Sequence, residues 1–206
     1  MQHQAQLDAA RMPDGTYDYT DCFRWVSPEF QKTDLVIGNL EVPLGGEPYT
    51  GYPAFSAPDA YLKALRKAGS MCCLRLTIIV WTGEGRGWSV PFVCWIPFGY
   101  PMSGLIAPHR NGWTFIRCWW NGRDSGWVFL NYTYGTNGLH PVTPNVVNYI
   151  DRDQMRLDIL KARLMKPDVL IACMHWGVEY QSLPRTEERA LTDWLLKMGV
   201  DHVIGA

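Results

Sequence analysis

The chain has 206 residues, 47% of them hydrophobic, and a net charge of −1 at pH 7, which predicts one domain with a buried core. Charges of both signs are interspersed and no apolar run approaches the ~18 residues of a membrane-spanning helix, so neither a nucleic-acid surface nor a membrane segment is expected. The six cysteines have no metal-type spacing such as CxxC, which argues against a disulfide framework and a cysteine zinc site.

Two helix starts are recognisable in the first 69 residues. Ser27 and Pro28 have the residue types of a helix cap and a first helical turn. The stretch 60–69 places leucines one turn apart and ends in Gly69, which predicts an amphipathic helix. The residues before Ser27 are polar and aromatic, and the start of the chain around His3 is expected to be solvated.

Between these helices, the apolar run 34–42 predicts a buried strand. Gly38 within it lets the backbone approach another group closely. The strand leads to Asn39 and Glu41, whose amide and carboxylate oxygens suit a hard metal ion. Capping of a loop by the asparagine explains the same residues equally well.

Residues 70–128 differ in composition from the rest of the chain. They hold seven of the ten tryptophans and four of the six cysteines but only two acidic residues, and no capped helix is predicted in them. One interpretation is an aromatic, loop-rich insertion. A second is translation in the wrong reading frame: back-translated codons for 70–83, shifted by one base, read F-D-V-L-L-A-A-N-N-H-R-L-D-R-G. That text is an apolar strand ending in Asn-Asn-His.

Regular patterns return at residue 129. The run 129–138 predicts a short strand leading into a Gly/Asn turn, and residues 151–165 predict a helix capped by Asp151. The apolar side chains of this helix are Met155, Ile159 and Ala162, widened by Leu157, Leu160 and Leu164. A last helix is predicted over 187–198 and a last strand over 200–204.

The stretch 168–174 is a short apolar run between Pro167 and Gly177, which predicts a strand buried on both faces. Its carboxyl end delivers His175 into a loop, where ligands bind in open α/β sheets. An imidazole at that place serves as a metal ligand or a proton carrier. The alternative is a half-buried histidine held by a backbone carbonyl.

Five separated motifs resemble the CapA family, the poly-γ-glutamate capsule synthesis proteins of bacteria. In chain order they are Gly38-Asn39-Leu40-Glu41, Pro48-Tyr49-Thr50-Gly51-Tyr52-Pro53, Asn131-Tyr132-Thr133-Tyr134-Gly135-Thr136-Asn137-Gly138, Met174-His175-Trp176-Gly177-Val178-Glu179-Tyr180 and Asp201-His202-Val203-Ile204-Gly205-Ala206. The resemblance covers residues 1–69 and 129–206. Five motifs in the right order are far more specific than any one of them.

The resemblance implies a calcineurin-like metallophosphoesterase fold, a four-layer α/β/β/α sandwich with two metal ions at the strand ends. The implied metal ligands are His3, Asn39, Glu41 and His175. His175 is the implied catalytic residue, with Trp176, Glu179 and Tyr180 beside it for substrate. The third metal motif, Asn-Asn-His, is found only in the shifted frame, and the first and last motifs are expected just beyond Met1 and Ala206. The chain, 1–206, is therefore expected to be an incomplete single domain with an irregular middle.

Three functions follow. The first is a CapA-type metal-dependent phosphoesterase-like enzyme of capsule synthesis, impaired in this chain. The second is a non-catalytic relic or binding module of the same fold. The third, independent of the family, is a carbohydrate- or peptide-binding domain in which Trp113, Trp119 and Trp120 form a stacking platform.

The resemblance also implies cofactors and partners. The cofactors would be divalent ions, with manganese, zinc and iron not distinguished, and we expect weak binding or none because ligand motifs are missing. The substrate would be a phosphate ester or a poly-γ-glutamate-type polymer, and other capsule-synthesis proteins would be partners. Family members act at the cell envelope, although no signal region follows Met1.

Overall fold

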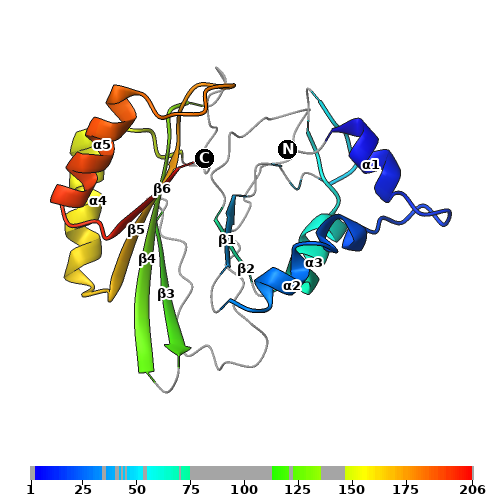
Figure 1. The fold of residues 1–206 in the computed structure, drawn as a ribbon, viewed down its shortest axis with the longest axis horizontal. Helices are drawn as coiled ribbons and strands as arrows, with labels where there is room; N and C mark the ends of the chain where they lie inside the picture. The colour runs from blue at the N-terminus through cyan, green and yellow to red at the C-terminus, as the bar shows by residue number, and fades with distance from the viewer. Residues whose placement is uncertain are drawn as a thin grey trace. The chain divides into compact units, whose positions relative to one another are not determined.

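The computed structural model describes residues 3–33, 36–39, 42, 44, 46–52, 55–69, 71–74, 113–120, 123–135 and 147–205 (Figure 1). The chain forms two compact units. The N-terminal unit comprises Met1–Gly99 with Thr136–His140, and the C-terminal unit comprises Tyr100–Gly135 with Pro141–Ala206. Each unit has a hydrophobic core of its own.

The N-terminal unit combines short helices with a small parallel sheet. Its elements are α1 (Gln4–Ala10), the 3₁₀ helix η1 (Thr20–Phe23), α2 (Ser27–Phe30), β1 (Val36–Asn39), α3 (Asp59–Ala68) and β2 (Met71–Leu74). Strands β1 and β2 are parallel, with Val36 opposite Met71 and Asn39 opposite Leu74. Helix α3 buries Leu65 in a cluster with Phe55. The amphipathic helix predicted over 60–69 is therefore confirmed.

The start of α2 differs from the prediction. Ser27 is the first residue of this helix, and its cap is Val26. The Ser27 hydroxyl instead donates a hydrogen bond to the carbonyl oxygen of Ala68, at the end of α3. The serine therefore joins two helices rather than capping its own, and the prediction of Ser27 as the cap was wrong.

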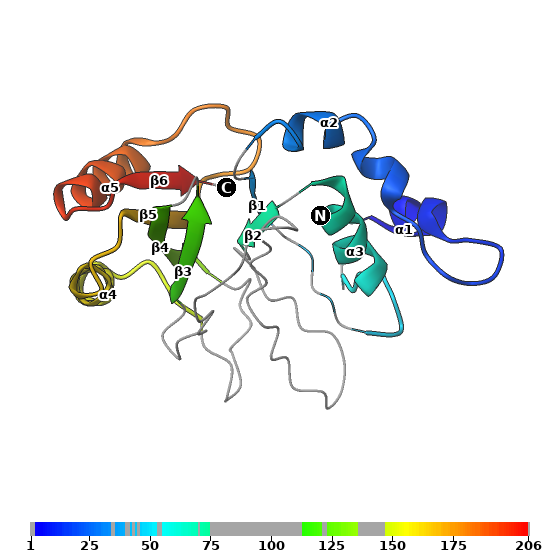
Figure 2. The same cartoon turned by 90° about the horizontal axis from the view of Figure 1, so that it is seen from below.

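The C-terminal unit is built on a four-stranded sheet in the order β3-β4-β5-β6. The strands are β3 (Trp113–Trp120), β4 (Arg123–Thr133), β5 (Val169–His175) and β6 (His202–Gly205). Strand β3 is antiparallel to β4, whereas β4, β5 and β6 are mutually parallel. Figure 2 shows helices α4 (Arg152–Leu164) and α5 (Thr186–Lys197) beside this sheet.

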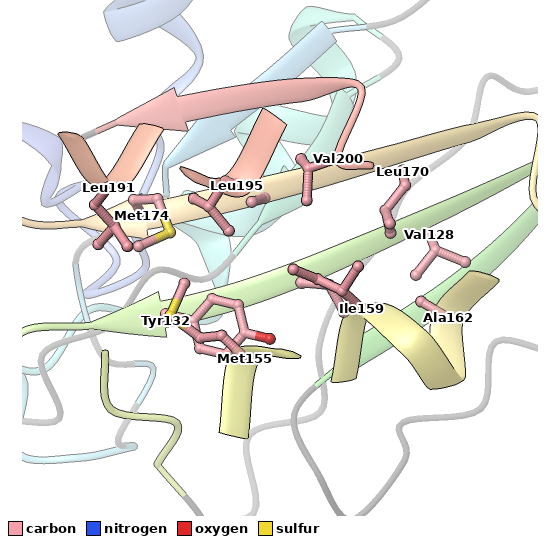
Figure 3. Close-up of a cluster of buried hydrophobic side chains, with 12 residues drawn as sticks. Val128, Tyr132, Met155, Ile159, Ala162, Leu170, Met174, Leu191, Leu195 and Val200 are labelled. Atoms are coloured by element: carbon pink, nitrogen blue, oxygen red, sulfur yellow. The ribbon is translucent and has the colours of Figure 1, made fainter. Parts of the chain in front are cut away.

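Both helices pack on one face of the sheet and bury it in an aliphatic core (Figure 3). The strands contribute alternate residues because successive side chains of a strand point to opposite faces. They are Val128, Leu130 and Tyr132 from β4 and Leu170, Ala172 and Met174 from β5. The helices contribute Met155, Ile159, Ala162, Leu191 and Leu195. The predicted burial of β5 on both faces is confirmed, since six of its seven residues are buried.

Helix α4 confirms part of its prediction and corrects part of it. Asp151 caps the helix, since its Oδ1 accepts a hydrogen bond of 2.8 Å from the Gln154 backbone N–H. The leucines at 157, 160 and 164, however, are 50%, 53% and 82% exposed. With 3.6 residues per turn they lie opposite Met155 and Ile159, so they form an outer stripe and do not widen the core face.

Strand β4 begins at Arg123, six residues before the predicted strand at 129, because it pairs with β3 along that length. Strands β2 and β3 also fall within 70–128, whereas residues 75–112 lie outside the described residues. In the part of the chain that the structure describes, no helix has the length and apolarity needed to cross a membrane.

Candidate functional site at the carboxyl edge of the sheet

His175 is the last residue of β5 and lies between β4 and β6 in the sheet. It pairs with Thr133 at the end of β4, and the preceding Met174 pairs with Gly205 at the end of β6. Because the three strands are parallel, their carboxyl ends meet at one edge, the usual position of a ligand site in an α/β sheet. The His175 side chain is only 6% exposed, so it belongs to the sheet interior and not to a free loop.

Tyr134 covers the imidazole. The two rings are stacked, with centroids 5.6 Å apart and planes inclined by 28°. The Tyr134 backbone N–H also donates a 2.9 Å hydrogen bond to the His175 carbonyl oxygen. Tyr134 is itself 57% exposed, so its ring lies between the buried imidazole and solvent.

Thr133 fixes the end of β4. Its hydroxyl donates a 2.9 Å hydrogen bond to the Gly135 carbonyl oxygen, and its backbone N–H donates to the Asn148 carbonyl at 2.9 Å. The Thr133 carbonyl in turn accepts from the Ile150 N–H at 2.9 Å. Hydrogen bonds to three residues therefore fix the backbone at Thr133, which pairs with His175.

The loop after His175 separates the three predicted substrate-binding residues. Trp176 packs on Gly205, where an added Cβ would lie 2.7 Å from the indole Nε1. Glu179 and Tyr180 are exposed, and Tyr180 has a positive φ of 65°, which is uncommon for a residue other than glycine. Trp176 is thus part of the framework, and the other two side chains face solvent.

The face of β4 and β5 that carries His175 also carries Asn131 and Cys173, which pair with each other. Burial raises the pKa of the Cys173 thiol to about 12, because an apolar environment disfavours the thiolate. Among the described residues, the buried Asn131 Oδ1 has no hydrogen-bond partner. Asn131 and Tyr134 were not among the predicted site residues, since the sequence does not reveal which residues of β4 lie opposite His175.

The other predicted ligands belong to the N-terminal unit. His3 is exposed at the start of α1, where its backbone N–H donates to Gln6 Oε1 at 2.7 Å, and its ring contacts Phe55 edge-on at 6.2 Å. Asn39 is the last residue of β1, and Glu41 lies outside the described residues. Their role as ligands of a shared site with His175 stays a prediction.

The described side chains do not by themselves form a metal site. Among them, no group of three or more histidines, cysteines, aspartates or glutamates is close enough to hold an ion. Protein metal centres commonly use three or four protein ligands. In the described part of the C-terminal unit, His175 is the imidazole at the carboxyl edge of the sheet. Trp113, Trp119 and Trp120 lie in β3, and their side chains are outside the described part.

A mixed sheet in which β4, β5 and β6 are parallel, with helices on one face and a histidine at its carboxyl edge, defines the class: an α/β protein. Residues 1–74 and 120–206 match the family model described as "Bacterial capsule synthesis protein PGA_cap". The chain belongs to this family, whose fold is calcineurin-like, and the predicted family and α/β fold class are confirmed.

The matched ranges contain all five motifs of the resemblance and leave out 75–119. That unmatched stretch lies within 70–128, where the composition changes. The frame-shift interpretation of this segment stays a hypothesis, which sequencing of the gene would test. No curated protein and no solved structure matches the chain.

Proposed function

We propose that this capsule synthesis protein binds an oxyanion-bearing substrate, a phosphate ester or a γ-glutamyl polymer, at the carboxyl edge of its parallel sheet. The observation that carries the proposal is the buried His175 at the end of β5, beside the ends of two parallel neighbours. An imidazole N–H is a good donor to carboxylate or phosphoryl oxygens. The family membership supports a role in capsule synthesis.

The proposal includes impaired metal-dependent chemistry. The family resemblance implies phosphoesterase-type catalysis with two divalent ions, but His175 is the one strand-end ligand that the described C-terminal unit provides. Ligand number and preorganisation determine metal affinity, so we expect weak binding of manganese or zinc. Isothermal titration that gives sub-micromolar, two-site binding to the purified chain would contradict this part of the proposal.

The main test is substrate binding by His175→Ala. We expect the affinity for phenyl phosphate or for a γ-glutamyl oligomer to fall about tenfold, the effect of losing one charge-assisted hydrogen bond. His202→Ala is the matched control, because His202 is exposed at the other end of the same sheet, at the start of β6. The two ligands, titrated separately by fluorescence or calorimetry, show which oxyanion is preferred.

Equal affinity of the wild type and the His175→Ala variant for both ligands would overturn the proposal.

A second function is favoured by one observation. The ligand motifs that the sequence lacks favour a binding module of the same fold without catalysis. Binding without hydrolysis of para-nitrophenyl phosphate in the presence of manganese would support this module, and hydrolysis that His175→Ala abolishes would support the enzyme.

A further inference from the structure

We propose that Tyr134 is a positioning residue for His175: its ring covers the buried imidazole and orients it. This inference rests on the proposed function of His175. It assigns a role to Tyr134, the residue that follows β4, which the sequence motif 131–138 does not explain by itself. The two residues are 41 positions apart in the sequence, and they meet because of the register of β4 and β5.

The first argument is the geometry of the two rings. Stacked aromatic pairs with centroids 4.5–7 Å apart are favourable, and the Tyr134 and His175 rings are 5.6 Å apart and inclined by 28°. A ring stacked on one face of the imidazole restricts rotation of its χ2 angle. The ring therefore sets the direction in which the imidazole edge points.

The second argument is that the backbone holds the tyrosine in place. The Tyr134 N–H bonds to the His175 carbonyl, which ties the two backbones together directly. The preceding Thr133 closes a tight turn through its hydroxyl and Gly135. A side chain on such a fixed backbone is preorganised, which is what a positioning residue requires.

The third argument is the difference in exposure. His175 is 6% exposed and Tyr134 is 57% exposed, so the outer face of the phenol ring meets solvent while its inner face meets the imidazole. Tyr134 also carries a hydroxyl that can donate to a carboxylate or phosphoryl oxygen. The pair would therefore favour an oxyanion presented along the ring edges.

The test compares Tyr134→Ala, Tyr134→Leu and Tyr134→Phe, with Tyr180→Ala as the matched control because the Tyr180 side chain is fully exposed. The first readout is the NMR chemical shift of the His175 ring protons, which a stacked aromatic ring displaces. The second is the rate of carbethoxylation of His175, followed by mass spectrometry of its peptide. Neither readout requires a ligand.

We expect Tyr134→Ala and Tyr134→Leu to remove the ring-current shift. Carbethoxylation of His175 should accelerate in Tyr134→Ala by about two- to tenfold, the factor that corresponds to the loss of one stacked pair. Tyr134→Phe should restore both wild-type readouts, and Tyr180→Ala should change neither. A purely structural role of Tyr134 would lower stability without this dependence on an aromatic ring.

Unchanged His175 shifts and carbethoxylation in a folded Tyr134→Ala or Tyr134→Leu variant would overturn the inference. This outcome is distinct from failure of the proposed function. If His175→Ala retains wild-type affinity for oxyanions, the proposed function fails while the coupling of the two rings can still be observed. If Tyr134→Ala leaves the imidazole unchanged, the positioning role fails even when His175 binds the ligand.

Discussion

Along β4 and β5, the two faces of the sheet in the C-terminal unit are both largely buried, but they have different compositions. The face under α4 and α5 carries the apolar residues Val128, Leu130, Leu170, Ala172 and Met174 together with Tyr132. The opposite face changes along the strands. Its paired residues are Phe129 with Ile171, then Asn131 with Cys173, and finally Thr133 with His175.

Within the paired parts of β4 and β5, one face is therefore apolar apart from Tyr132, whereas the other becomes polar toward the carboxyl edge. The apolar start of the opposite face is compatible with a core, whereas polar groups accumulate toward the carboxyl edge, where they need partners or ligands. Burial alone would not distinguish the two faces, since Met174 and His175 are both buried. The direction of the polarity change along the strand points to the end where we propose that the ligand binds.

The largest expected effect concerns Cys173, in the middle of the opposite face. Because burial raises its pKa from 9.0 to about 12, its thiolate population at pH 8 should be about a thousandfold lower than that of an ordinary thiol. Iodoacetamide should therefore label the exposed Cys22 and leave Cys173 unlabelled, as measured by peptide mass spectrometry. Labelling in guanidinium chloride is the control, and rapid labelling of native Cys173 would show that this face opens.

The same shift predicts the pH dependence of stability. Between about pH 9 and pH 12 the unfolded chain releases the Cys173 proton that the folded chain keeps. The contribution of the protonated Cys173 thiol to the free energy of unfolding is therefore complete below pH 9 and is lost as the pH rises toward 12. Urea unfolding of the wild type and of Cys173→Ala over this range should show a steeper decline for the wild type.

The second effect contrasts the two sides of α4. Ile159→Ala should lower the free energy of unfolding by about 3 kcal/mol, because Ile159 is 1% exposed in the helix-covered core. Leu160→Ala, one residue later on the outer stripe, should cost less than about 0.5 kcal/mol. Urea unfolding followed by circular dichroism measures both, and similar losses for the two variants would mean that the stripe is covered in solution.

A third effect concerns the carboxyl edge. Gly205→Ala should cost about 1–3 kcal/mol, because the added methyl would lie 2.7 Å from the Trp176 indole. Tryptophan fluorescence should shift as the ring moves. Gly135→Ala is the matched control, since an added Cβ there has no atom within 4 Å. A neutral Gly205→Ala variant would indicate that Trp176 is not fixed at this edge.

The smallest effect concerns a buried polar cluster beside the helix-covered core. Tyr132 donates a 3.1 Å hydrogen bond to Asp158 Oδ2, and Gln154 Nε2 donates to Oδ1 at 2.8 Å. Tyr132→Phe should cost about 1 kcal/mol, because the carboxylate loses one donor and keeps the other. Thermal unfolding measures the loss, with Tyr180→Phe as the exposed control. An unchanged melting temperature would show that Asp158 finds a replacement donor.

Local patterns predicted much of the fold. The helix over 151–165, its Asp151 cap and the strand that ends at His175 were predicted, since each depends on residues adjacent in sequence. Helix α1 was missed because His3 is not a typical capping residue. Strand β3 was missed because its pairing with β4 depends on residues outside its own sequence.

The site was predicted in part. The position of His175 at a strand end followed from the apolar run before it, and the family resemblance named the residue. Its neighbours Tyr134 and Asn131 could not be predicted, because the register of β4 against β5 is set by packing and not by either strand alone. The exposure of Leu160 could not be predicted either, because the sequence of α4 does not reveal which of its leucines face the sheet.

The backbone hydrogen bonds of Thr133 have a consequence for how far the length of the chain after β4 can vary. The hydrogen bonds of Thr133 to Asn148 and Ile150 join the end of β4 to the residues that precede α4. Such a backbone clamp makes the geometry at the end of β4 independent of the number of residues between 135 and 147, and loop-closure entropy grows only slowly with length. Connections of different length between these two points would therefore leave the backbone next to His175 in place.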